Sequence, residues 1–269
     1  MVPSYYMNYL LAIMLGFVEG ATEFIPISSS GHLIIVRELL GVNTEGGLSF
    51  DAVLQLATTC ALLVYFWKDI WNLLCTAYKW IFGKTVDVKD KIFLQAIILG
   101  TVPAVVFGFF LEKQMDTVFR NVHLVAFTLI LGSLLMWYAQ TRKENQSFSL
   151  KKGIIIGFYQ CLSLIPGISR SGATISGGLL SGLNRSDAVR FSFLLSIPIL
   201  FGAGLKKLFE VRHDLFATGF GTSLFLGSVV AFITGLLAIN FLMKYLKDHN
   251  LNVFIWYRVI LALLILIFV

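Results

Sequence analysis

The chain has 269 residues, of which 57% are hydrophobic and only 13% are charged. Soluble domains carry about 25% charged residues, so the composition excludes an ordinary soluble domain. The apolar runs are continuous rather than alternating, which argues against a membrane β-barrel and indicates an all-α polytopic membrane protein. The net charge of +6 does not indicate nucleic-acid binding, because the Lys and Arg residues lie in short loops between apolar runs.

Six stretches are long and apolar enough to cross a hydrocarbon core of about 30 Å. We predict transmembrane crossings near residues 50–67, 91–111, 121–141, 187–205, 219–242 and 251–269. Between the first two, residues 68–84 carry aromatic side chains among lysines. This composition predicts a helix that lies at the membrane interface.

Two other apolar segments are each interrupted by a break rich in Pro, Gly and Ser. Residues 5–18 and 32–40 flank the first break, and residues 153–165 and 173–183 flank the second. Each flanking run is too short to cross the membrane. We therefore predict two re-entrant helical hairpins, at residues 5–40 and 153–183, whose irregular backbone must be enclosed by protein or by a watery cavity.

The two breaks are copies of one another. The residues that recur 141 positions later are Gly16, Phe17, Ile27, Ser28, Ser30 and Gly31. Each copy precedes three predicted crossings, and an odd number of crossings makes the second half inverted relative to the first. We expect two inverted-topology repeats, residues 1–145 and 146–269, in one membrane domain with a site near the midplane where the halves meet.

Positive charge predicts the orientation of this arrangement. With alternating crossings, about twice as many Lys and Arg residues collect on one side as on the other, and that side is expected in the cytoplasm. Both termini, and the opening of the site, are then predicted to face outward from a bacterial cytoplasmic (inner) membrane. Arg170 and Arg258 stay within the membrane. For Arg258 we expect a structural role, paired with an acidic residue or with backbone carbonyls.

Glu19 and Glu23 are four residues apart, so they share one face if this segment is helical. Their mutual repulsion grows in a medium of low dielectric constant. A shared proton, an arginine or a divalent cation would relieve it, and oxygen-only ligands suit Mg²⁺ or Ca²⁺. The alternative is a helix end that emerges into water with both carboxylates solvated.

The first break places serines directly before an apolar run. Serine is a favoured helix N-cap, and a helix N-terminus with free N–H groups also binds anions. Ser28, Ser29 or Ser30 could therefore contact a phosphate group, or attack it if a base lies near. His32 lies three residues after Ser29 and is a candidate base, with a purely structural histidine as the alternative.

The second break, residues 166–172, holds Arg170 between two serines. An arginine within the membrane costs about 2.5–3.5 kcal/mol on insertion scales unless it is paired. A phosphate group bound by both arms of the guanidinium would offset that cost. The alternative is a structural ion pair between Arg170 and a glutamate across the two halves, and the two interpretations are compatible.

With these residues identified, the chain resembles the undecaprenyl-pyrophosphate phosphatases of the bacitracin-resistance type. The family's acidic helix followed by Pro-x-Ser-Ser-(Ser/Thr)-Gly-His is matched by residues 19–32, and its Pro-Gly-x-Ser-Arg-Ser-Gly motif by residues 166–172. The resemblance implies hydrolysis of undecaprenyl pyrophosphate, recycling of the lipid carrier for peptidoglycan synthesis, tolerance to bacitracin, and a divalent cation. The residues to which it assigns roles are Glu19, Glu23, Ser29, His32 and Arg170.

This chemistry needs mainly positioning and charge stabilisation. We expect Glu19 and Glu23 to hold Mg²⁺ or Ca²⁺ on the diphosphate, Arg170 to stabilise the equatorial oxygens, and Ser29 to attack with His32 as its base or orienter. A cation-activated water is the competing attacker. Further phosphate contacts are expected from Ser28, Ser30, Ser169, Ser171 and Gly172.

Two other functions are considered. A lipid-carrier transporter is the alternative, because inverted repeats with broken helices are common among transporters. A lipid phosphatase of the phosphatidic-acid phosphatase class is not indicated, because no histidine follows Arg170 through Leu183. Membrane lipids are the expected surroundings, and the sequence leaves the oligomeric state open, with a homodimer compatible.

Overall fold

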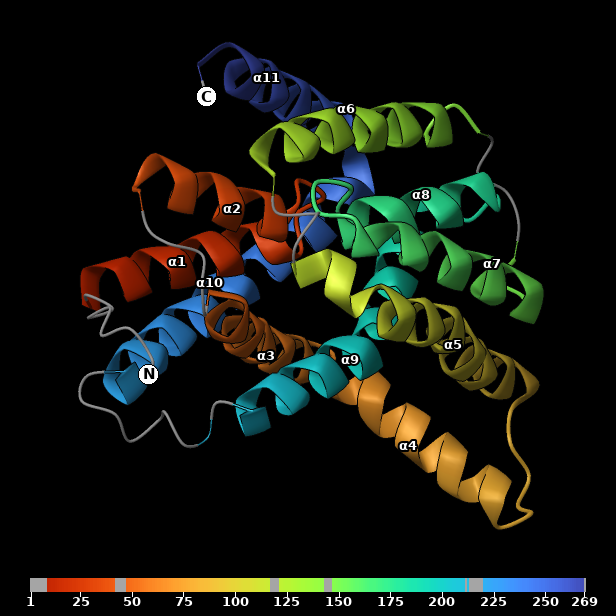
Figure 1. Ribbon diagram of the computed structural model, residues 1–269. Helices are drawn as coiled ribbons and strands as arrows, with labels where there is room; N and C mark the ends of the chain where they lie inside the picture. The colour runs from red at the N-terminus through yellow and green to blue at the C-terminus, as the bar shows by residue number, and fades with distance from the viewer. Residues whose placement is uncertain are drawn as a thin grey trace.

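The computed structural model describes residues 9–41, 47–116, 121–142, 147–210, 212 and 220–268. Within these residues the chain forms helices and no strand (Figure 1). In chain order the helices are α1 (Tyr9–Glu23), α2 (Ser29–Leu39), α3 (Gly47–Tyr65), α4 (Trp67–Ile81), α5 (Val88–Asp116), α6 (Val122–Ala139), α7 (Leu150–Cys161), the short 3₁₀ turn η2 (Leu162–Leu164), α8 (Arg170–Leu180), α9 (Arg185–Glu210), α10 (Phe220–Asp248) and α11 (Asn252–Phe268).

Each predicted crossing corresponds to one helix, namely α3, α5, α6, α9, α10 or α11. In the described residues α5, α6, α9 and α10 are long and apolar enough to span a membrane, α3 and α4 qualify as one bent pair, and α11 is apolar but shorter. These helices also expose large apolar side chains, such as Phe109 and Phe110 of α5, which are 77% and 72% exposed. The chain is therefore a polytopic helical membrane protein.

The predicted interfacial segment forms a separate helix. At Phe66 the chain turns by 80° between α3 and α4. Helix α4 exposes Trp67, Trp71 and Tyr78, and Lys84 lies over the Tyr78 ring. This arrangement of aromatic and basic groups is the one expected of a helix at a membrane surface.

The boundaries of the two broken segments differ from the prediction. Helix α1 continues through both glutamates to Glu23 instead of ending near residue 18, and the predicted residues 5–8 lie outside the described part of the chain. Helix α7 begins at Leu150, before the predicted start at residue 153, because Ser149 accepts a hydrogen bond from the Lys152 N–H and caps the helix there. The periodicity of apolar residues did not show this capping.

Each broken segment packs on a helix of the other half of the chain. Helix α1 lies against α10, and α7 lies against α5 (Figure 1). The repeated glycines permit both contacts: a Cβ atom on Gly16 would lie 2.2 Å from the Gly227 carbonyl oxygen, and one on Gly157 would lie 2.3 Å from that of Gly100. Small residues allow such close backbone approach in membranes, where packing replaces hydrophobic expulsion as the driving force.

A substitution at one of these glycines tests the packing. We expect Gly157→Ala to lower the apparent melting temperature in detergent by several degrees, because overpacking of this kind costs about 1–3 kcal/mol. The matched control is Gly202→Ala in α9, where an added Cβ would have no packing neighbour within 4 Å beyond the adjacent backbone of its own helix. Alanine is the better helix former by about 0.5–1 kcal/mol, so the control should be unchanged or more stable. Equal behaviour of the two variants would contradict the packing argument.

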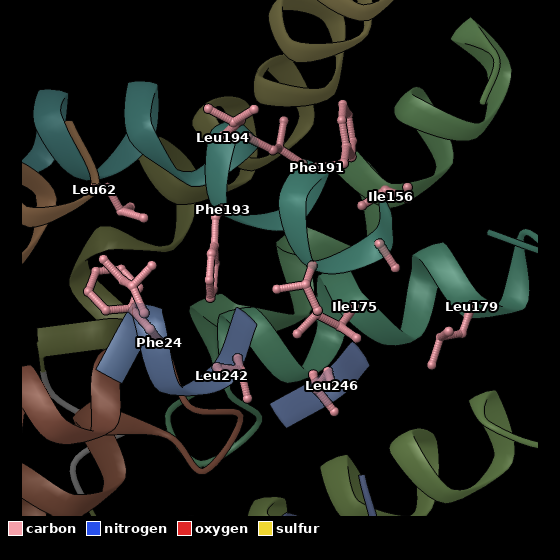
Figure 2. Close-up of a cluster of buried hydrophobic side chains, with 14 of the residues drawn as sticks. Phe24, Leu62, Ile156, Ile175, Leu179, Phe191, Phe193, Leu194, Leu242 and Leu246 are labelled. Carbon is pink, nitrogen blue, oxygen red and sulfur yellow. The ribbon is translucent and has the colours of Figure 1, made fainter. Parts of the chain in front are cut away.

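A core of aromatic and aliphatic side chains lies beside the first break (Figure 2). Phe24, the residue after α1, packs edge-on against Phe193 of α9, with ring centroids 5.5 Å apart. Ile175 of α8 and Leu242 of α10 belong to the same cluster. The end of α1, and with it Glu23, is therefore fixed by side chains from several helices.

Candidate functional site

The two breaks have the same local geometry. Ser28 caps α2 by accepting a hydrogen bond from the Gly31 N–H at 3.3 Å, and Ser169 caps α8 by accepting one from the Gly172 N–H at 3.2 Å. Both serines have a positive φ angle, 76° and 72° respectively. Such a backbone conformation costs a residue other than glycine about 1–3 kcal/mol and is concentrated at functional sites. The repeated sequence thus produces a repeated, strained turn.

Each strained serine precedes one residue of the predicted site. Ser29 is the first residue of α2 and Arg170 is the first residue of α8, so they occupy the same place in the two copies. The N-termini of α2 and α8 each present the positive end of a helix dipole. The loops before them contact one another, because the Gly167 N–H donates to the Ser28 hydroxyl oxygen at 3.1 Å.

Glu23 is the point at which the two breaks meet. Arg170 donates from Nη2 to Glu23 Oε1 in an ion pair, and the Ser29 hydroxyl donates to Glu23 Oε2. The Glu23 side chain is 2% exposed, whereas Arg170 is 13% exposed. Residues separated by 147 positions are therefore joined at one buried carboxylate.

Glu19 and Gln55 complete the surroundings of Glu23. Glu19 is 1% exposed, lies within electrostatic range of Glu23, and has no hydrogen-bond partner at Oε1. The two glutamates share a face of α1, and neither is solvated, which removes the alternative of a helix end in water. The Gln55 amide of α3 donates to Glu23 Oε1 at 3.3 Å.

His32 does not pair with Ser29. Its Nδ1 lies 2.7 Å from the Ser28 carbonyl oxygen and its Nε2 lies 2.7 Å from the Tyr257 hydroxyl of α11. The two rings stack with an interplanar angle of 6°. With both ring nitrogens engaged, His32 connects the start of α2 to α11, and the carboxylate of Glu23, rather than the imidazole, lies beside the Ser29 hydroxyl.

The predicted phosphate-binding residues fall into two groups. The hydroxyls of Ser28 and Ser169 and the Gly172 N–H are engaged in the capping bonds, and Ser171 is buried with its hydroxyl 3.2 Å from that of Ser169. Ser30 is the exposed member of the set. Ser30 is therefore accessible to a phosphate group, whereas the hydrogen bonds of the other four residues stabilise the two turns.

Arg258 of α11 lies between the two breaks and contacts the backbone of both. It is completely buried and donates hydrogen bonds to backbone carbonyls of both loops. Of the two partners expected from the sequence, an acidic residue or backbone carbonyls, the structure shows the carbonyls. Two residues of this site were not foreseen. Gln55 offered a signal, as a polar side chain inside a predicted crossing, whereas Tyr257 offered none.

The donor set near Glu23 suits a hard cation. In the described residues no group of three or more His, Cys, Asp or Glu side chains is arranged as a metal site. Mg²⁺, however, is commonly held by one or two carboxylates together with substrate phosphates rather than by an all-protein cage. The unpartnered Oε1 of Glu19 beside Glu23 provides such an oxygen pair. The residues therefore fit Mg²⁺ or Ca²⁺ completed by the oxygens of a diphosphate.

Comparison with known proteins places this site in a family. The family model for the bacitracin resistance protein BacA matches residues 12–264, which include both breaks. The chain belongs to the BacA family. The similarity proposed from the two motifs is thus confirmed, and it extends over nearly the whole chain.

Relatives named undecaprenyl-diphosphatase are similar over nearly their whole length. The undecaprenyl-diphosphatase of Moorella thermoacetica is 40% identical over 264 residues, covering 96% of this chain and 97% of its own. That of Corynebacterium striatum is 40% identical over 271 residues, with 98% and 95% covered. That of Paenarthrobacter aurescens is 39% identical over 264 residues, with 96% and 95% covered.

Proposed function

We propose that this BacA-family protein is an undecaprenyl-diphosphatase of the bacterial inner membrane. It removes the terminal phosphate of undecaprenyl diphosphate and leaves undecaprenyl phosphate, the carrier for cell-wall polymers. The activity also confers tolerance to bacitracin, which sequesters the diphosphate. The observation that carries the proposal is the meeting of Ser29, Glu23 and Arg170 at one buried point, from opposite halves of the chain.

Substrate binding releases Glu23 from Arg170 in this proposal. Arg170 binds Glu23 Oε1 and is the more exposed partner of the pair. A diphosphate offers oxygens that match both arms of the guanidinium, so Arg170 can transfer its N–H groups to the phosphate. Glu23 keeps its contact with the Ser29 hydroxyl, and its Oε2 is placed to accept the hydroxyl proton.

The reaction proceeds from that contact. Ser29 Oγ attacks the terminal phosphorus, its proton moves to Glu23 Oε2, and the bond from phosphorus to the bridging oxygen breaks to leave undecaprenyl phosphate. Water then attacks the phosphorus of the phosphoserine, the bond from phosphorus to Ser29 Oγ breaks, and the proton held by Glu23 returns to Ser29 Oγ as inorganic phosphate leaves. Arg170 and the N-termini of α2 and α8 stabilise the charge on the phosphoryl oxygens.

Glu19 and Glu23 would hold the divalent cation. When bound, Mg²⁺ or Ca²⁺ supplies positive charge that neutralises the diphosphate oxygens. His32 contributes by orientation, since its two hydrogen bonds fix the start of α2 relative to Tyr257.

The direct test is phosphate release by the purified protein. Undecaprenyl diphosphate in detergent should yield inorganic phosphate, and a chelator should abolish release by removing the cation. Addition of Mg²⁺ or Ca²⁺ should restore it. Undiminished release in excess chelator would contradict the cation proposal, and failure of the untreated protein to release phosphate while it transports the carrier would favour the transporter.

The architecture that we propose is an inverted repeat of six crossings and two re-entrant hairpins. Residues 1–145 and 146–269 form the repeats, with hairpins from α1–α2 and α7–α8. The helix contacts support this symmetry. In the proposed repeat α1 corresponds to α7 and α5 to α10, and α1 packs on α10 just as α7 packs on α5. Helix α3 also contacts its counterpart α9, and α6 contacts its counterpart α11.

We further propose that both termini and the site opening face outward. Cysteines introduced at Lys206 and Lys84, in a variant without native cysteines, test this orientation on intact cells. An impermeant thiol reagent should label Lys206→Cys and spare Lys84→Cys. The reverse pattern would overturn the orientation.

A further inference from the structure

Arg258 of α11 forms hydrogen bonds to both breaks and to helix α6. Its donors reach the carbonyl oxygens of Pro26 at 3.1 Å, Gly167 at 2.9 Å and Ile168 at 3.0 Å. They also reach the carbonyl oxygen of Leu129 and the hydroxyl of Ser133, both on α6. The guanidinium is completely buried, so these protein groups take the place of water around its charge.

The carbonyls that Arg258 binds lie next to the strained serines. Ile168 directly precedes Ser169, and Pro26 lies two residues before Ser28. Both serines have positive φ angles, a conformation that persists only where the surroundings hold it. Arg258 therefore fixes the peptide units that lead into Ser29 and Arg170.

The neighbouring helix is shaped to admit this guanidinium. A Cβ atom on Gly132 of α6 would lie 2.1 Å from Arg258 Nη2 and 2.8 Å from the Ile168 carbonyl oxygen. Only glycine leaves room there for the arginine and the second break together. A lysine carries the same charge but has three donors on one nitrogen and lacks the planar fork that spans these separated acceptors.

We infer that Arg258 is a positioning residue for the proposed reaction. It touches neither Ser29 nor Glu23 and acts by holding the two breaks in one register, so that Ser29 and Arg170 arrive at the same carboxylate. The inference rests on the proposed function for its kinetic consequence. The tie between the two loops stands independently of any activity.

Arg258→Lys tests the inference in the full-length protein. Misplacement of reacting groups by about 1 Å can cost about 10²-fold in rate, so we expect kcat for phosphate release to fall by about 10²-fold per folded molecule. Hydrogen exchange should rise in peptides that cover both loops, residues 24–28 and 165–169, and not in α5. The matched control is Arg142→Lys, where an exposed arginine donates to Tyr138 and should leave kcat unchanged.

A double variant separates positioning from simple stabilisation. If Arg258 acts through Arg170, then Arg258→Lys should slow an Arg170→Lys protein by only a few-fold, because the geometry it supports is already lost. The inference would be overturned if the losses of kcat in the two single variants simply multiplied in the double variant. It would also be overturned if Arg258→Lys kept the wild-type kcat and the wild-type hydrogen exchange. If Arg258→Lys does not fold, Gly132→Ala crowds the guanidinium without removing it and should give the same loop exchange and loss of kcat.

The outcomes also distinguish the two proposals. An inactive wild-type protein would refute the proposed function, while the exchange measurement would still test the tie between the loops. An active wild type with an unaffected Arg258→Lys variant would refute only the role of Arg258.

Discussion

Arg170→Lys is expected to lower kcat/KM for phosphate release from undecaprenyl diphosphate by about 10³-fold. Lysine keeps the positive charge but loses the planar pair of donors, so it cannot bind two phosphoryl oxygens in parallel. Arginines that stabilise a transferring phosphoryl group contribute about 10³–10⁵-fold to the rate. The measurement is inorganic phosphate released by purified protein at several substrate concentrations, with folding checked by melting temperature.

The matched control is Arg190→Lys. Arg190 also pairs with a carboxylate, that of Asp69, but it is 48% exposed at the surface of α9. Surface ion pairs contribute about 0–1 kcal/mol, so this variant should keep its activity within about twofold. Wild-type activity in Arg170→Lys, or equal losses in both variants, would remove Arg170 from the site.

Ser29→Ala has the second large expected effect. If Ser29 is the nucleophile, its removal should lower kcat by at least about 10³-fold, the order of loss seen when an attacking hydroxyl is deleted. Acid quenching of the wild-type reaction should trap phosphoserine in the peptide that contains Ser29. Mass spectrometry of that peptide is the decisive measurement, because the loss of rate alone does not identify the attacking atom.

The control for Ser29 is a neighbouring hydroxyl with a different partner. Thr22 is buried on α1, and its hydroxyl donates to the Val18 carbonyl oxygen at 2.6 Å rather than to Glu23. Thr22→Val should stay within about tenfold of wild type. If Ser29→Ala also keeps most of its activity and no phosphoserine is trapped, a cation-activated water is the attacker and Ser29 serves only to orient Glu23.

Local features of this protein were predictable from the sequence. The apolar runs placed the helices α3, α5, α6, α9, α10 and α11, because a helix that crosses about 30 Å of hydrocarbon needs a long run of apolar residues. The four-residue spacing put Glu19 and Glu23 on one face, and the serines of both breaks cap helices as their residue type favours. Ser28 recurs as Ser169 in the repeated motif, and the two serines have the same backbone conformation and make the same capping hydrogen bond.

Helix ends were predicted less well. Helix α1 carries both glutamates within its last turns, and a break rich in Pro and Ser gives no sign of where the last helical bond forms. The start of α7 depends on one capping bond from Ser149, which periodicity does not reveal. Such boundaries follow from single hydrogen bonds rather than from a pattern over many residues.

The sequence by itself determined the membrane class, the two broken segments and the residue types of the site, because these depend on neighbours along the chain. Only the tertiary structure decided which groups these residues contact. Glu23, rather than His32, lies beside Ser29, and His32 instead contacts Tyr257. Gln55 donates to Glu23, and backbone carbonyls surround Arg258. These contacts join residues up to 232 positions apart. They arise from the packing of α3, α6 and α11 around the two breaks, and local spacing carries no information about that packing.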